Sequence, residues 1–167
     1  GTITYEYTYL DCASNPFVWT YTYTVDITTV PTEIGGPVAS SSTVECLADA
    51  TVPAVLPTVE DVCGNVLVPL GVPLNGGTYV DCEGTYTFIY EYQDCAGNPF
   101  FWVYTYTIDI TTAPSEIGGP VASSSTVDCA ADAVAPTLPV IEDVCGNILT
   151  PLVGSPIMSG TYVDCEG

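Results

Sequence analysis

An internal repeat of 83 residues constrains this chain more than any other feature of its sequence. Three cysteines recur at that spacing: Cys12 as Cys95, Cys46 as Cys129, and Cys82 as Cys165. Cys63 recurs as Cys145 after 82 residues, because one residue is lost before it and regained after it. Self-similarity at a fixed period indicates a tandem array of one structural unit. The fold of the chain is therefore the fold of one unit, used more than once.

The Pro and Gly residues of "VPTEIGGPVAS" and "APSEIGGPVAS" mark the boundaries between units. They divide the chain into three segments. We expect the C-terminal part of one repeat at residues 1–30, one complete repeat at 31–112, and the N-terminal part of the next repeat at 113–167. A chain that starts and stops in mid-repeat is expected to be a window cut from a longer array.

Bulky apolar side chains alternate with threonines in each copy, as in a strand with one buried face. In residues 102–110 the members of one face are Trp102, Tyr104, Tyr106, Ile108 and Ile110. The segments 85–92 and 19–27 alternate in the same way, and "DCAGNP" supplies turn residues between two such runs. No segment shows helical periodicity. About seven short strands per repeat predict an all-β chain of tandem immunoglobulin-like antiparallel sandwiches.

Composition removes several classes of function. The chain has 20 Asp and Glu but no Lys, Arg or His, so its formal charge is −20. Nucleic acid is excluded as a partner, because phosphate recognition requires basic side chains. No apolar run is long enough for membrane insertion. His and Lys, the usual general base and amine nucleophile, are missing, so we expect no enzyme and no cofactor. The chain also has no trypsin cleavage site, which suits a durable extracellular protein.

Eight cysteines without a CxxC spacing or a His partner favour disulfides over zinc, and thus an oxidising, extracellular compartment. Four cysteines per repeat permit three connectivities. In an immunoglobulin-like order, the turns "DVCGN" and "DCAGN" lie at one end and the other two cysteines at the opposite end. We therefore expect three bonds within repeats, Cys63–Cys95, Cys46–Cys82 and Cys129–Cys165. Cys12 and Cys145 are expected to pair with neighbouring repeats.

The sequence has a characteristic order of motifs, which is a strand, "EDVCGN", a second strand, "DCEGTYTFIYEYQDCAGN" and "WVYTYTI". This order resembles the HYR-like, immunoglobulin-like tandem repeats of giant Bacteroidota surface proteins. These include gliding-motility adhesins exported by the type IX secretion system. The resemblance covers both periods, and its motifs are turn and cysteine signatures that specify fold better than ligand. It implies a structural repeat of a long cell-surface adhesin or filament shaft, whose partners are neighbouring repeats and like chains in a fibre.

Other interpretations of the same residues predict binding or polymerisation. Glu60 and Asp61 near one turn, with Asp94 and Asn98 near another, offer oxygens to calcium; their alternative role is local turn bonding. Rows of threonines offer a flat face to ice or sugar, but such rows also pair well across strands; they are Thr20, Thr22, Thr24, Thr105 and Thr107. A pilus-like subunit that polymerises by strand exchange is the remaining alternative. We expect no metal site and no catalytic residue.

Overall fold

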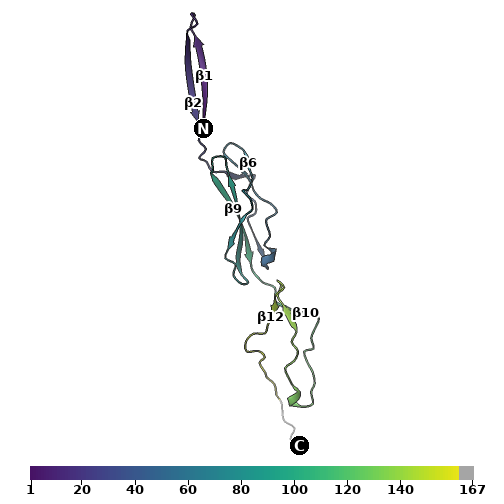
Figure 1. Cartoon of the computed structure of the whole chain (residues 1–167). Helices are drawn as coiled ribbons and strands as arrows, with labels where there is room; N and C mark the ends of the chain where they lie inside the picture. Colours follow the sequence, from purple (N-terminus) through teal and green to yellow (C-terminus); the bar gives the residue numbers. More distant parts are fainter. Residues whose placement is uncertain (162–167) are drawn as a thin grey trace.

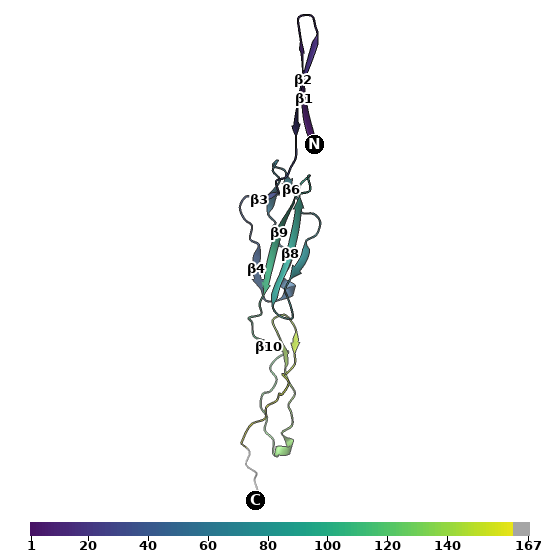
Figure 2. The same ribbon diagram turned by 90° about the vertical axis from the view of Figure 1, so that its left-hand side faces the viewer.

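The computed structural model describes residues 1–161 as three bodies arranged in a row (Figure 1). We call residues 1–30 the N-terminal hairpin, residues 31–112 the central module and residues 113–161 the C-terminal segment, and their strands follow one another in this order. The view turned by 90° shows the same end-to-end order (Figure 2). In the described residues the helical elements are two short 3-10 turns, and none is long and apolar enough to cross a membrane.

The central module contains seven strands in two sheets. The smaller sheet has the order β3-β5-β6, with antiparallel pairs; its strands are β3 (Thr32–Ile34), β5 (Thr58–Glu60) and β6 (Val66–Leu67). The larger sheet has the order β4-β9-β8-β7; its strands are β4 (Ser41–Val44), β9 (Pro99–Ile108), β8 (Gly84–Gln93) and β7 (Leu74–Gly77). The turn η1 (Leu47–Asp49) follows β4.

The core lies between these two sheets and is built from the alternating face of β8 and β9. Its buried members are Ala50, Val59, Phe88, Tyr90, Tyr92, Trp102 and Tyr106. Val59 of β5 is 0% exposed and packs in the same cluster as the aromatic side chains of the hairpin. The predicted all-β sandwich and its aromatic inner face are therefore confirmed. One detail differs, because β4 pairs with β9 in parallel and the sheets are not wholly antiparallel.

The N-terminal hairpin consists of β1 (Thr2–Leu10) and β2 (Pro16–Thr24) in antiparallel register, with Tyr7 opposite Trp19. It repeats the sequence of β8 and β9, but no second sheet covers it, and every residue of both strands is exposed. Trp19 is 45% exposed, whereas its counterpart Trp102 is 5% exposed. The strand pattern therefore forms the hairpin without burying it.

The C-terminal segment repeats the smaller sheet of the central module. Its strands pair in the order β10-β11-β12, antiparallel throughout. They are β10 (Ser115–Ile117), β11 (Val140–Glu142) and β12 (Ile148–Leu149), with the turn η2 (Ala130–Asp132) between the first two. The cysteine at position 165 lies outside the described residues.

Candidate functional site

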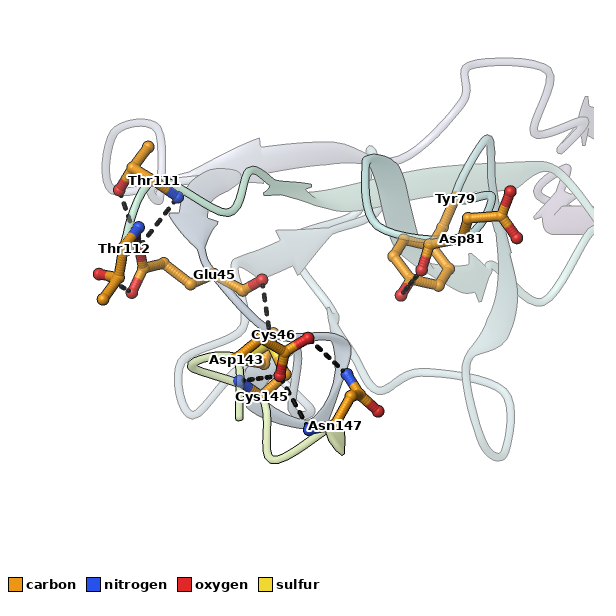
Figure 3. Close-up of a disulfide and its surroundings, with 9 residues drawn as sticks. All are labelled: Glu45, Cys46, Tyr79, Asp81, Thr111, Thr112, Asp143, Cys145 and Asn147. Atoms are coloured by element: carbon orange, nitrogen blue, oxygen red, sulfur yellow. Dashed lines mark hydrogen bonds between the residues drawn. A yellow bond between two sulfur atoms is a disulfide. The ribbon is translucent and has the colours of Figure 1, made fainter. Parts of the chain in front are cut away.

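A disulfide joins the central module to the C-terminal segment. Cys46, which follows β4, is bonded to Cys145, which lies in the turn between β11 and β12. Their Cα atoms are 5.5 Å apart, although 99 residues separate them in the sequence. Figure 3 shows the turn that carries Cys145 lying against the chain around Cys46. The junction between two successive repeats is therefore covalent.

This bond corrects the expected pairing of Cys46 with Cys82. Both cysteines lie beyond the same end of the larger sheet, as expected, but Cys46 bonds to the turn of the next repeat. The reason is geometric, since that turn reaches back and brings Cys145 to the end of β4. The expected Cys63–Cys95 bond is also not formed. The free cysteines of the described residues are all exposed: Cys12, Cys63, Cys82, Cys95 and Cys129. Cys165, the expected partner of Cys129, lies outside the described residues.

Four turns of the described residues are built in the same way: an Asp begins the turn, the cysteine follows it, and an Asn lies four residues after the Asp. They connect β1 to β2, β5 to β6, β8 to β9 and β11 to β12. In the turn of Cys145, Asp143 Oδ1 accepts the backbone N–H groups of Cys145 and Asn147 at 2.9 and 2.8 Å. Asp143 Oδ2 accepts Asn147 Nδ2 at 2.9 Å. These hydrogen bonds lower the pKa of Asp143, and the bond from the Asn147 side chain has the largest effect. The turn therefore presents its cysteine in a defined position.

The same bonds recur in the other three turns, begun by Asp11, Asp61 and Asp94. These turns contain three of the four residues considered for calcium, Asp61, Asp94 and Asn98, and the fourth, Glu60, lies directly before one of them. The oxygens of Asp61 and Asp94 accept N–H groups of their own turns, and these residues are 7% and 6% exposed. The described residues contain no group of three or more His, Cys, Asp or Glu arranged to hold a metal ion. The carboxylates of Asp61 and Asp94 are turn-forming groups.

Glu45, directly before Cys46, binds the linker that leads into the next repeat. Its Oε1 accepts the backbone N–H groups of Thr111 and Thr112 at 3.1 and 2.8 Å and the Thr111 hydroxyl at 2.8 Å. Its Oε2 accepts the Thr112 hydroxyl at 3.0 Å. The hydroxyl bonds from Thr111 and Thr112 are the main cause of the lowered pKa of Glu45. Two consecutive residues thus hold the linker and the next repeat (Figure 3).

The sequence prediction did not include Glu45, although the repeat contains a signal for it. An acidic residue precedes this cysteine in both copies, as "VEC" and "VDC", and the Thr pair after the long strand also recurs, as Thr28–Thr29 and Thr111–Thr112. In a chain whose only formal side-chain charges are negative, one more acidic residue is not distinctive. The signal is that the acidic residue before the cysteine and the Thr pair after the long strand occur together in each copy.

A second junction contact lies at the opposite end of the central module. Asn98 Nδ2, in the turn between β8 and β9, donates a hydrogen bond to the carbonyl oxygen of Ile27 at 3.0 Å. Ile27 belongs to the linker that follows β2. The turn between β8 and β9 therefore touches the repeat before it, just as the turn of Cys145 touches the module before it.

Four of the five threonines proposed for ice or sugar lie opposite another threonine on the neighbouring strand, whereas Thr20 lies opposite Glu6. Thr22 lies opposite Thr4 with their hydroxyl oxygens 2.9 Å apart, and Thr24 lies opposite Thr2. Thr105 and Thr107 lie in the middle of the larger sheet, between β4 and β8. This arrangement accounts for the rows through strand pairing.

Comparison with known protein families places most of the chain in one family model. A family model described as an HYR-like domain with 4 cysteines matches residues 34–108 and 118–167, about three-quarters of the chain. No curated protein and no solved structure matches the chain significantly.

Proposed function

Because the chain belongs to the family of HYR-like domains with four cysteines, we propose that it is a structural repeat of a long surface adhesin or filament shaft. HYR-like domains are extracellular repeat modules. The disulfide between Cys46 and Cys145 is the observation that carries the proposal, because it transmits force between repeats through a covalent bond in addition to the backbone. The function is mechanical, and it consists of reach, stiffness and chemical endurance.

Stiffness is supported by the number of constraints at a junction. A single linker peptide would let two modules rotate about soft backbone dihedrals. Here the linker residues Thr111 and Thr112 are bound to Glu45, and the next repeat is bonded to Cys46. Two attachments on consecutive residues restrict both bending and twisting.

Endurance is supported by the composition and by the fold. Trypsin-like proteases have no Lys or Arg to recognise in this chain. Cleavage elsewhere requires local opening, which is rare where backbone groups are paired and buried. The charge of −20 opposes the collapse of adjacent shafts onto one another, over a range of about 8 Å at physiological salt.

A more specific context rests on the sequence resemblance alone. On that basis we assign the repeat to a giant Bacteroidota surface protein of the gliding-motility type, secreted by the type IX system and exposed at the cell surface. Its partners are neighbouring repeats of the same array. Detection of the intact protein on the surface of gliding cells, and its loss in a secretion mutant, tests this context.

Electron microscopy of an array of eight repeats tests the mechanical function. With a strand rise of about 3.3 Å per residue, β9 spans about 33 Å, so a rise of about 35–40 Å per module is expected. Oxidised arrays should form straight rods of one fixed length. A matched array with serine at every Cys46 position should bend more. Oxidised arrays that are as flexible as the serine variant would contradict the proposal.

A pilus-like subunit remains the second candidate, because the exposed face of the N-terminal hairpin favours it. Its aromatic side chains, such as Tyr7 and Trp19, are counterparts of core residues in the central module. The C-terminal segment of another copy carries the matching small sheet. If the chain polymerises as a pilus-like subunit, filaments of the 167-residue chain should lengthen as the protein concentration rises. Particles of constant size at all concentrations would exclude it.

A further inference from the structure

We propose that a second disulfide crosses every junction, between the cysteine at the position of Cys82 and the cysteine at the position of Cys95 in the next repeat. This inference rests on the proposed tandem arrangement. It assigns all four cysteines of a module to bonds between modules, two at each end, so that none forms a bond within its own module.

Cys82 lies at the same end of the module as Cys46, which already forms a bond across the junction. In the larger sheet Val44 pairs with Ile108, and Ile108 pairs with Gly84, so these three residues form one row across β4, β9 and β8. Cys46 lies two residues beyond this row and Cys82 lies two residues before it. With about 4.8 Å between neighbouring strands, the two cysteines leave the sheet roughly 10 Å apart.

The loop that carries Cys82 is held in place. The Tyr79 hydroxyl donates a hydrogen bond to the carbonyl oxygen of Asp81 at 2.6 Å (Figure 3). Val80 and Glu83 exchange backbone bonds at 3.0 and 3.3 Å on either side of the cysteine. Cys82 is exposed and carries a free thiol. Its position is therefore set by the module, and the thiol is open to a partner outside it.

Cys95 lies at the opposite end, in a turn that touches the preceding repeat. Asn98, three residues after Cys95 in the same turn, donates its hydrogen bond to Ile27 of the preceding linker. Cys63 lies in the turn that corresponds to that of Cys145, and Cys145 is bonded to the preceding module. By this correspondence both turns at this end face the preceding repeat, whereas Cys46 and Cys82 lie at the end that faces the following one.

The repeat places the two cysteines of the second bond at the same junction. Gly1 corresponds to Gly84, and Gly1 and Val25 exchange backbone bonds of 2.8 Å at the end of the N-terminal hairpin. In a preceding repeat, the counterpart of Cys82 stands two residues before Gly1. It therefore lies within two residues of the strand residue that pairs with Val25, and the turn of Cys95 contacts the same linker two residues further on, at Ile27.

The arrangement also accounts for the free cysteines. Within these 167 residues, Cys46 and Cys145 are the only two whose assigned partner is present. In a longer array each remaining pair forms by thiol–disulfide exchange. Two thiols are oxidised to one S–S bond, and a small disulfide such as oxidised glutathione is reduced to two thiols, taking both electrons and both protons.

The test uses the whole chain extended by a second copy of residues 2–30 after Gly167, which takes the place of Gly1. The extension completes the third repeat and supplies one new cysteine, the appended copy of Cys12. The protein is oxidised with a glutathione buffer, cleaved after acidic residues and mapped without reduction. We expect two cross-links, Cys46–Cys145 and Cys82 to the appended Cys12. In the unextended chain Cys82 should be alkylated as a free thiol.

Two serine variants of the extended chain provide the controls. Cys82→Ser should remove the second cross-link alone. Cys129→Ser, the matched change at the far end, should leave both cross-links. The proposal is overturned if Cys46–Cys145 forms while Cys82 stays a thiol, or if Cys82 bonds within its own module. Loss of Cys46–Cys145 itself would instead count against the proposed function, so the two failures are distinguishable.

Discussion

The hairpins β1–β2 and β8–β9 have nearly the same sequence and the same register, yet one is exposed and the other forms the core of a module. Tyr21 and Tyr23 have ring centroids 4.9 Å apart, and their counterparts Tyr104 and Tyr106 are 5.0 Å apart. The strand register and the spacing of these rings are thus nearly the same in both hairpins. The difference is the cover provided by residues 31–77, which contribute Val59, Ala50 and the small sheet. The alternation of apolar and polar residues determines that the strands form. Packing against other residues of the same repeat determines how stable they are.

Truncation of the central tryptophan should separate the two hairpins most strongly. Trp102→Ala removes a core side chain that is 5% exposed, and we expect a loss of about 3–5 kcal/mol in the free energy of unfolding. Trp19→Ala, at 45% exposure, should change the stability of the central module by less than about 0.5 kcal/mol. Urea denaturation followed by circular dichroism measures both. Equal losses would mean that the N-terminal hairpin is covered in solution.

Replacement of the turn asparagine should reduce stability more in a turn that contacts a neighbouring repeat than in a turn that contacts none. Asn98→Ala deletes bonds to Asp94 and to the Ile27 carbonyl oxygen, and should cost about 1–2 kcal/mol. Asn15→Ala deletes a bond to Asp11 in a fully exposed turn, and its effect on the central module should be near zero. The same denaturation assay applies. A silent Asn98→Ala variant would show that the contact with Ile27 is not formed in solution.

Tyrosine hydroxyls within the core should differ according to their partners. The Tyr106 hydroxyl donates to the Thr51 carbonyl oxygen at 2.8 Å, so Tyr106→Phe should cost about 1 kcal/mol. The Tyr90 hydroxyl is buried and has no hydrogen-bond partner among the described residues, and burial raises the pKa of this group. Tyr90→Phe should therefore be neutral or slightly stabilising. The opposite ranking in thermal denaturation would contradict the packing described.

Low pH should weaken the turns and the contact between Glu45 and the linker. We expect this to be the smallest of the four effects on stability. The folded-state pKa values of Glu45, Asp61 and Asp94 are lowered by the hydrogen bonds that their carboxylates accept. A lowered pKa stabilises the folded state above the unfolded value, and this contribution is lost as pH falls through the folded value. Stability should be flat from pH 8 to about 5 and should decline below about 4. Glu45→Gln should reduce the decline; an unchanged acid profile would contradict the linker contact.

The strands, the aromatic inner face and the turns follow from the sequence, because each depends on neighbours close in the chain. The disulfide does not, because Cys46 has partners of equal chemistry within its module and beyond it. The choice depends on where the turn of Cys145 docks, which is a property of two repeats together. Glu45 is missed for a related reason, since its partners Thr111 and Thr112 belong to the linker. The features that join repeats are those that a single repeat does not reveal.

Disulfide mapping of the oxidised 167-residue chain, cleaved after acidic residues without reduction, tests the central claim most directly. The account predicts a cross-linked peptide containing Cys46 and Cys145, and Cys82 alkylated as a free thiol. A peptide that joins Cys46 to Cys82 would show that the cysteines stabilise single modules, and would contradict a covalent shaft.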